Sequence, residues 1–221
     1  MTMSRISHAL AKTRREGIRA GLARAWELSR RPVYNSEEHV WYQLDVKAER
    51  PRREFVEGVR LVRAGADEAY RVEELGQVET EARERLSAGN DLWLALDNED
   101  RTLFVCWTFR GETPVAAAPH GQLPLPAGTA CLEDSVAAPL ARGKGIAPAS
   151  WTAIADILAT EGFESMITKV TTDNAPSRKA VQKSGFREIG VMRLTRMGPR
   201  QRVVLAASGG VAAVLAQSLG A

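Results

Sequence analysis

The chain has 221 residues, a length that fits one domain with a substantial hydrophobic core. Hydrophobic residues make up 44% and charged residues 26% of the sequence, which is ordinary for a globular protein. The formal net charge is only +3, and so small an excess excludes the strongly basic surface of a nucleic-acid-binding protein.

The two cysteines, Cys106 and Cys131, have neither the spacing of metal ligands nor the density of a disulfide framework. We interpret both as packed strand residues in a protein of the reducing cytosol, and we expect no metal site. The first 22 residues lack the apolar run of a signal peptide. These features together predict a cytoplasmic protein.

The N-terminal segment differs from the rest of the chain in charge, because residues 1–31 hold eight Lys or Arg against two Glu. Its apolar residues recur at near-helical spacing, at Ile6, Leu10, Ile18, Leu22 and Trp26. We favour a helix that docks on its own domain through this stripe. The alternative is a basic amphipathic helix that contacts an anionic membrane surface or a partner. Pro32 ends the helix, and a strand is predicted at 39–47.

A regular series of strands and helices begins at Gly58. In chain order we predict a strand at 58–64, a helix from Asp67 to Leu75, a helix at 77–89 with Gly89 at its C-terminus, a hairpin of two alternating strands at 91–111, a strand at 130–138, a helix at 148–160, a strand at 166–172, a helix at 174–184, and strands near 187–196 and 201–206. This mixed order predicts an α/β or α+β fold around a mixed sheet.

The C-terminal end carries no charge from Val203 to Ala221. We interpret residues 207–221 as a soft tail that follows a strand. A stretch of this length also suffices to span a bilayer, which we take as the minor alternative because the stretch is mostly Ala, Gly and Ser.

The stretch Arg142-Gly143-Lys144-Gly145 lies between a predicted strand and a helix whose first turn holds Pro148. Backbone amides at a helix start have no helical partner, and together with the helix dipole they form a site for a phosphate or pyrophosphate. The glycines let the backbone approach such a ligand, and Arg142 and Lys144 add positive charge. Neither the P-loop pattern nor the dinucleotide fingerprint fits this stretch.

Two motifs resemble those of the GNAT N-acetyltransferase superfamily. Residues 142–147 match its Arg/Gln-x-x-Gly-x-Gly/Ala motif, and residues 173–186 resemble a second signature in which an Asn is followed by Ala or Ser and then by Gly-Phe. The resemblance covers about residues 59–206 and implies a mixed sheet with splayed parallel strands and helices on both faces. It leaves 1–58 as an N-terminal extension and 207–221 as a C-terminal tail.

The resemblance implies an acyltransferase that moves an acetyl or other acyl group from acetyl-CoA, its co-substrate, to an amine acceptor by direct attack. The pantetheine arm would lie between the strands at 130–137 and 166–172. The residues implied to bind coenzyme A are Val136, Ala137, Arg142, Gly143, Lys144, Gly145, Ile146, Ala147 and Asn174.

Three residues are candidates for proton transfer. Direct attack needs an unprotonated amine, so a general base is useful, and Glu133 and Asp134 lie on the relevant strand. Alternation would place them on opposite faces, and we favour Glu133 because it resembles a glutamate of the family's fourth strand. The alternative for each is a paired carboxylate at the rim of the sheet. Many family members carry a Tyr where Val181 stands here, so Ser177 or a water would have to protonate the leaving thiolate.

The acceptor is expected to be a small-molecule or peptide amine. Residues 67–86 carry seven Asp or Glu against three Arg, which suits a cationic amine or marks two solvated helix faces. The sequence leaves a homodimer open. The alternative function is a coenzyme A-binding module with weak or no catalysis, which acts through residues 1–58 on a protein partner or a membrane surface.

Overall fold

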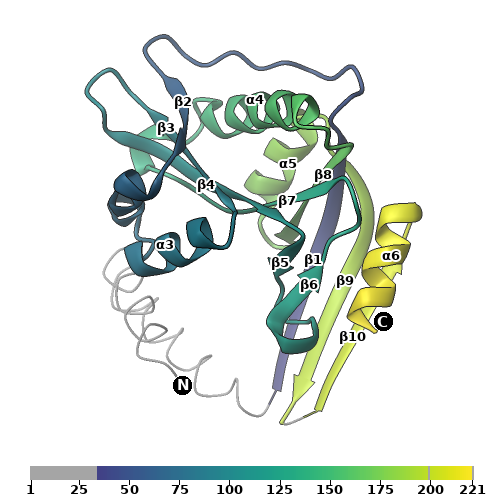
Figure 1. Cartoon of the computed structure of the whole chain (residues 1–221). Helices are drawn as coiled ribbons and strands as arrows, with labels where there is room; N and C mark the ends of the chain where they lie inside the picture. The colour runs from purple at the N-terminus through teal and green to yellow at the C-terminus, as the bar shows by residue number, and fades with distance from the viewer. Residues whose placement is uncertain (1–33, 199, 221) are drawn as a thin grey trace.

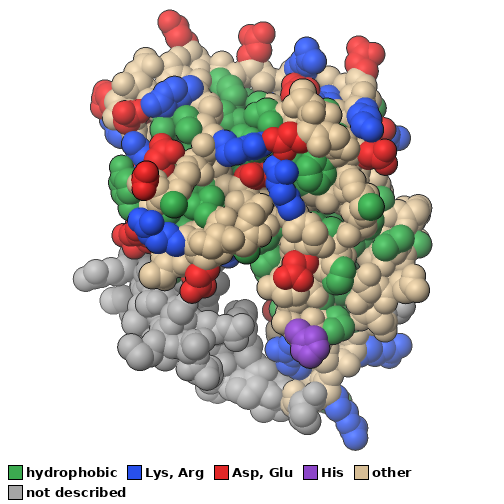
Figure 2. Space-filling model, viewed as in Figure 1, with side chains coloured by type: hydrophobic (Ala, Val, Ile, Leu, Met, Phe, Trp, Pro, Cys, Tyr) green, Lys and Arg blue, Asp and Glu red, His purple; other side chains and the backbone are tan. Residues whose placement is uncertain are grey.

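The computed structural model describes residues 34–198 and 200–220 (Figure 1). The helix predicted within residues 1–31 lies outside the described residues, so its docking and its alternative membrane contact stay predictions. Acidic and basic side chains are interspersed over the face of the molecule shown in Figure 2. The expectation that nucleic acid is not a partner also stays a prediction.

An eight-stranded sheet in the order β10-β9-β1-β8-β7-β4-β3-β2 forms the centre of the protein. Its strands are β1 (Tyr34–Asp45), β2 (Arg60–Ala64), β3 (Asp91–Leu96), β4 (Thr102–Arg110), β7 (Thr129–Ala137), β8 (Ser165–Thr171), β9 (Arg187–Met197) and β10 (Arg200–Ala207). Neighbouring strands are antiparallel except β7 and β8, which are parallel. The predicted mixed α/β fold is confirmed.

Helices and a small hairpin cover both faces of this sheet (Figure 1). The elements are the 3₁₀ helices η1 (Ala66–Leu75), η2 (Pro119–Gly121) and η3 (Pro139–Ala141), the helices α3 (Glu79–Ser87), α4 (Ile146–Thr160), α5 (Ala175–Lys183) and α6 (Gly210–Leu219), and the hairpin strands β5 (Glu112–Pro114) and β6 (Gln122–Pro124).

Adjacent residues of β1 show which element covers which face. Tyr42 contacts Arg178 of α5, whereas Trp41 pairs across the strands with Lys169, whose ammonium lies 3.5 Å from the carbonyl of Pro114 in the hairpin. Because neighbouring strand residues point to opposite faces, α5 and the β5–β6 hairpin lie on opposite sides of the sheet. η1 and α3 lie on the same side as the hairpin. Gln77, between η1 and α3, binds Trp107, and Trp107 pairs across the strands with Glu133. Glu133 in turn forms an ion pair with Lys169 on the hairpin side.

The hairpin predicted at 91–111 is present as β3 and β4, with a turn in which the amide of Asp100 donates to the carbonyl of Asp97. The predicted alternation of its strands is wrong, because every residue from Thr102 to Phe109 is buried. Helices and the hairpin cover both faces of the sheet at this point, so a continuous apolar run replaces the in–out pattern. Cys106 and Cys131 are buried free thiols, which confirms them as packed strand residues.

The strand expected at 39–47 forms β1 and lies inside the sheet, between β8 and β9. The proposed limit between an extension ending at 58 and a domain starting at 59 therefore passes through one continuous sheet, and the domain limits themselves stay a prediction. The expectation of a soft tail at 207–221 is wrong, because α6 forms there and buries Ala212, Leu215 and Leu219. Within the described residues, no helix has the length and apolar character needed to cross a bilayer.

Candidate functional site

The parallel strands β7 and β8 separate after a short paired segment. They pair only from Thr129 to Cys131 on β7 and from Ser165 to Ile167 on β8. Beyond this point β7 stays attached to β4 as far as Ala137, and β8 stays attached to β1 as far as Thr171. The two strands therefore diverge as the splayed pair that the sequence resemblance implies, and they leave a wedge between their facing backbone edges.

The hydrogen-bond pattern decides which backbone groups point into this wedge. The amide of Ala138 donates to the carbonyl of Leu103 on the β4 side at 2.8 Å, and Val136 lies opposite Val105 in the same ladder. Because backbone groups alternate between the two edges of a strand, the groups of Val136 point toward β4 and those of Ala137 point toward β8. Of the two residues expected beside the thioester, Ala137 is thus the one with a backbone amide aimed into the wedge.

A β-bulge interrupts β7 just before Val136. Val105 of β4 pairs with Val136, and Trp107 pairs with Glu133, so an advance of two residues on β4 corresponds to three on β7. Asp134 lies within this interval and has a φ of +50°. The expectation that alternation would separate the Asp134 side chain from that of Glu133 is wrong, because the extra residue breaks the alternation. Both carboxylates instead turn toward groups on the face that carries α3.

The segment between η1 and α3 holds this bulge in place. The Gln77 side chain donates from Nε2 to the Asp134 carbonyl at 2.9 Å and accepts from Trp107 Nε1 at 3.0 Å. Arg85 of α3 lies over the Trp107 ring and binds the Asp134 carboxylate, with Nη1 2.8 Å from Oδ2. No local pattern predicts Gln77 or Arg85 as a partner of Asp134, because the tertiary fold brings both residues to β7.

The glycine-rich loop follows β7 and η3 and leads directly into α4. Gly143 and Gly145 have φ values of +76° and +77°, a conformation that favours glycine. Gly145 is the N-cap of α4, which has no side-chain cap, so the amides of Ile146 and Ala147 in the first turn have no partner within the helix. The loop therefore has the uncapped helix start that an anion site requires.

Positive charge flanks this loop, since Arg142 and Lys144 are both exposed. Within residues 34–198 and 200–220, neither side chain forms an ion pair. Asn174 follows β8 and is the N-cap of α5, where its Oδ1 accepts from the amide of Ser177 at 3.2 Å. Because the ends of parallel strands lie at the same edge of a sheet, the loop and Asn174 flank the mouth of the wedge.

Glu133 and Lys169 form a buried ion pair across the wedge. Glu133 Oε1 lies 2.6 Å from Lys169 Nζ, and each side chain is only 13% exposed. Each residue lies two positions beyond the last paired residues of its strand, Cys131 and Ile167. Burial raises the pKa of Glu133, and the adjacent Lys169 ammonium opposes that rise. Burial alone would lower the pKa of Lys169, but the Glu133 carboxylate raises it on balance.

The helix α5 brings Ser177 and Val181 to the opposite face of the sheet. Val181 is buried, and Ser177 is half-buried beside the helix start. The fully buried Tyr42 of β1 points toward α5, and its hydroxyl accepts a hydrogen bond from Arg178 Nε at 3.1 Å. Tyr42 lies outside the range 59–206 that the motif resemblance covers, so the sequence does not predict it as a neighbour of α5.

The acidic segment at 67–86 forms η1 and α3, on the same side of the sheet as Glu133. Some of its carboxylates already serve local structure, since Glu74 accepts from the amide of Thr102 and Glu79 pairs with Arg83. The cationic acceptor expected from this segment stays a prediction.

Comparisons with known proteins point to one family. The model of the acetyltransferase (GNAT) family matches residues 66–186. Three solved structures share the fold: a GCN5-related N-acetyltransferase from Sphaerobacter thermophilus (15% identity, 84% of this chain, TM-score 0.54), a Drosophila protein (13%, 80%, 0.55) and a tandem GNAT protein from the clavulanic acid biosynthesis pathway (16%, 75%, 0.55). The matched part spans 57%, 57% and 55% of those chains, respectively. No curated protein matches the sequence.

Proposed function

This chain belongs to the GNAT acetyltransferase family, and on that premise we propose that it is an N-acyltransferase that moves an acetyl or other acyl group from acyl-CoA to an amine. One observation carries the proposal: the wedge between β7 and β8 opens beside an uncapped helix start preceded by Arg142 and Lys144. A pantetheine arm needs the first feature and a pyrophosphate needs the second.

The residues present fit coenzyme A as a co-substrate. The amides of Gly143, Gly145, Ile146 and Ala147 would bind the pyrophosphate, with Arg142 and Lys144 adding charge. The Ala137 amide, which faces the wedge, would bind the pantetheine or the thioester carbonyl, and Val136 would only border it. Asn174 would contact the arm from the other side of the mouth, because its amide nitrogen is not used in capping α5.

The residues expected to transfer protons are Glu133, Asp134 and Ser177, and both carboxylates are paired with cations. Glu133 is the carboxylate nearest the wedge and stays the candidate base, but it is already paired with Lys169. Asp134 is paired with Arg85, which supports its interpretation as a structural carboxylate. Ser177 or water would protonate the leaving thiolate, since Val181 has no proton to donate.

The paired carboxylates also favour a second candidate function. A coenzyme A-binding module with little catalysis, acting on a protein partner or membrane surface through its N-terminal residues, would need neither a free base nor an acid. For both candidate functions we place the protein in the cytoplasm, because its two cysteines are buried free thiols.

Thiol release from acetyl-CoA in the presence of a panel of amines separates the two candidates. The enzyme releases coenzyme A in proportion to the amine acetylated. Calorimetry with coenzyme A must show binding in either case, so binding without release above background for any amine favours the module.

A further inference from the structure

The two carboxylates of β7 that could take a proton from an attacking amine are both already bound to cations. Glu133 Oε1 is 2.6 Å from Lys169 Nζ, and Asp134 Oδ2 is 2.8 Å from Arg85 Nη1. The sequences of β7 and β8 contain no other carboxylate. The strands that form the wedge therefore offer an incoming ammonium ion no unpaired base.

The two ion pairs differ in how strongly they hold their carboxylate. The Asp134 side chain is 49% exposed, so water screens its attraction to Arg85. Both partners of the Glu133 pair are 13% exposed. Other groups that act on the Lys169 ammonium are the Pro114 carbonyl at 3.5 Å, the Trp41 ring, whose centroid lies 5.6 Å away, and the Asp134 carboxylate, which is itself paired with Arg85. None of them replaces the Glu133 carboxylate.

Protonation of Glu133 would therefore leave a buried ammonium without its counter-charge. Breaking a buried ion pair on one side is strongly unfavourable, because the remaining charge has lost its solvation. Lys169 thus opposes the transfer of a proton to Glu133, against the burial that on balance raises the pKa of this carboxyl. With both carboxylates of β7 paired, water is the proton acceptor on which the inference below rests.

From this pairing we infer the class of the acceptor: an amine of low basicity, such as the α-amine of a peptide or an aryl amine, with alkylamines such as the lysine side chain as poor acceptors. The inference rests on the proposed function. The lone pair of the neutral amine attacks the thioester carbonyl carbon, the N–C bond forms, and the C–S bond breaks with its electron pair leaving on sulfur. One amine proton passes to water, and the thiolate takes a proton from water.

A matched pair of acceptors tests the inference on the full-length protein. One is lysine amide blocked at Nε, with a free α-amine of pKa about 8, and the other is lysine amide blocked at Nα, with a free side-chain amine of pKa about 10.4. At pH 7 the first is roughly 230-fold richer in free base. We expect its kcat/KM, measured by thiol release from acetyl-CoA, to be higher by at least about tenfold, with an aryl amine also accepted.

The variant Lys169→Met tests whether the ion pair sets this preference. It frees the Glu133 carboxylate to take a proton, so the ratio of the two kcat/KM values should fall by about tenfold. Lys47→Met is the matched control, because Lys47 also pairs with a glutamate, Glu164, but both side chains are more than half exposed and lie at the other end of the strands. Its ratio should equal that of the wild type.

The outcomes are distinct. A wild-type protein that acetylates the Nε amine as well as or better than the α-amine overturns the inference and leaves the proposed function standing. An unchanged ratio in a folded Lys169→Met variant overturns the role of the ion pair. If the protein binds coenzyme A but no amine in the panel causes thiol release above background, the proposed function is overturned and the inference falls with it. If Lys169→Met does not fold, the wild-type comparison of α-amine, aryl amine and Nε amine decides alone.

Discussion

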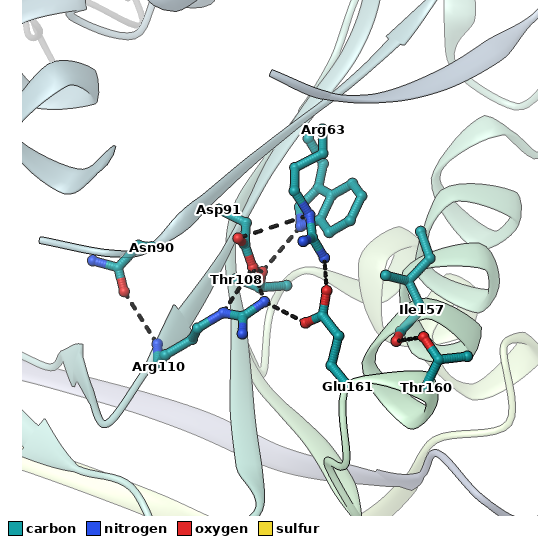
Figure 3. Close-up of polar contacts among 9 residues, drawn as sticks. Arg63, Asn90, Asp91, Thr108, Arg110, Ile157, Thr160 and Glu161 are labelled. Atoms are coloured by element: carbon teal, nitrogen blue, oxygen red, sulfur yellow. Dashed lines mark hydrogen bonds and ion pairs between the residues drawn. The ribbon is translucent and has the colours of Figure 1, made fainter. Parts of the chain in front are cut away.

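Arg110 of β4 binds Glu161 at the C-terminal end of α4, with Nη2 2.6 Å from Oε2, and so ties the helix to the sheet (Figure 3). The same guanidinium lies 2.7 Å from Asp91 of β3, and Arg63 of β2 binds the other oxygen of Glu161 at 2.5 Å. A carboxylate at a helix C-terminus is unfavourable for the helix dipole unless cations compensate it, as these two arginines do. These contacts fasten the C-terminal end of α4 to β2 and β4.

Replacing Glu161 with Gln is expected to lower stability by about 1–2 kcal/mol at pH 7, because two charge-assisted hydrogen bonds are lost. Burial alone would raise the pKa of Glu161, but Arg110 and Arg63 lower it on balance. A lowered pKa means that the stabilisation is present above the unfolded pKa, near 4.3, and is lost as the pH falls through the folded pKa. Thermal melts of both proteins should therefore begin to converge as the pH falls below about 4.3 and should coincide below the folded pKa, and a difference that does not shrink in acid would contradict this.

Replacing Gly145 with Glu is expected to abolish coenzyme A binding in calorimetry. The change adds a Cβ at a φ of +77° and puts a negative charge at the helix start that would bind the pyrophosphate. Gly162→Glu is the matched control, because Gly162 has a φ of +89°, follows the other end of α4 and also has open space for a Cβ. The control should lose stability and keep its affinity, whereas normal binding by Gly145→Glu would refute the pyrophosphate assignment.

Gln77 is expected to act as a positioning residue for the thioester site. Gln77→Leu removes the donor to the Asp134 carbonyl and loosens the bulge that precedes Ala137, so kcat should fall by roughly 10- to 100-fold, as small misplacements of reacting groups do. The KM for acetyl-CoA should change less, because the loop at 142–147 is untouched. Gln77→Glu still accepts from Trp107 but cannot donate to Asp134, so normal kcat in this variant would show that the Trp107 contact is the important one.

Arg50 is expected to fasten the segment between β1 and β2 to α4. Its side chain is only 7% exposed, binds Asp156 of α4 and donates to the carbonyl of Val46 at 2.6 Å. Arg50→Met should cost about 2–3 kcal/mol and speed cleavage by trypsin in this segment. Arg52→Met removes a side chain that is 81% exposed and 3.9 Å from the same carboxylate, and it should have little effect. Equal melting temperatures for the two variants would argue against the anchor.

The local features of this fold were the predictable ones. The hairpin around Asp97–Asp100, the glycine loop at 142–145 and the helices predicted at 148–160 and 174–184 each depend on residues close together in the sequence, so their patterns could be recognised. The partner of Glu133 could not, because Lys169 reaches it only when β7 and β8 become neighbours. The bulge at Asp134 was equally hidden, since a single positive φ at a non-glycine residue leaves no mark in the sequence.

The position of β1 was missed for a different reason. The recognised motifs lie at 142–147 and 173–186, and nothing in residues 34–45 resembles them. The strand nevertheless pairs with β8 from His39 to Asp45, so the backbone on one side of the wedge is supported by a segment that the motif pattern left out. Residues that support a site without contacting its ligand are apolar and have no distinctive sequence pattern, so Trp41 and Tyr42 resemble any two buried strand residues.

This placement of β1 also bears on how the protein forms during synthesis. β1 leaves the ribosome before either of its neighbours, and β8 and β9 appear only after everything from β2 to α4 has been made. Until then its apolar residues have no strand to pair with, and closing so long a loop is slow. The sheet can therefore be completed only late, and an unfinished chain exposes two strand edges at which a chaperone or a second nascent chain can bind.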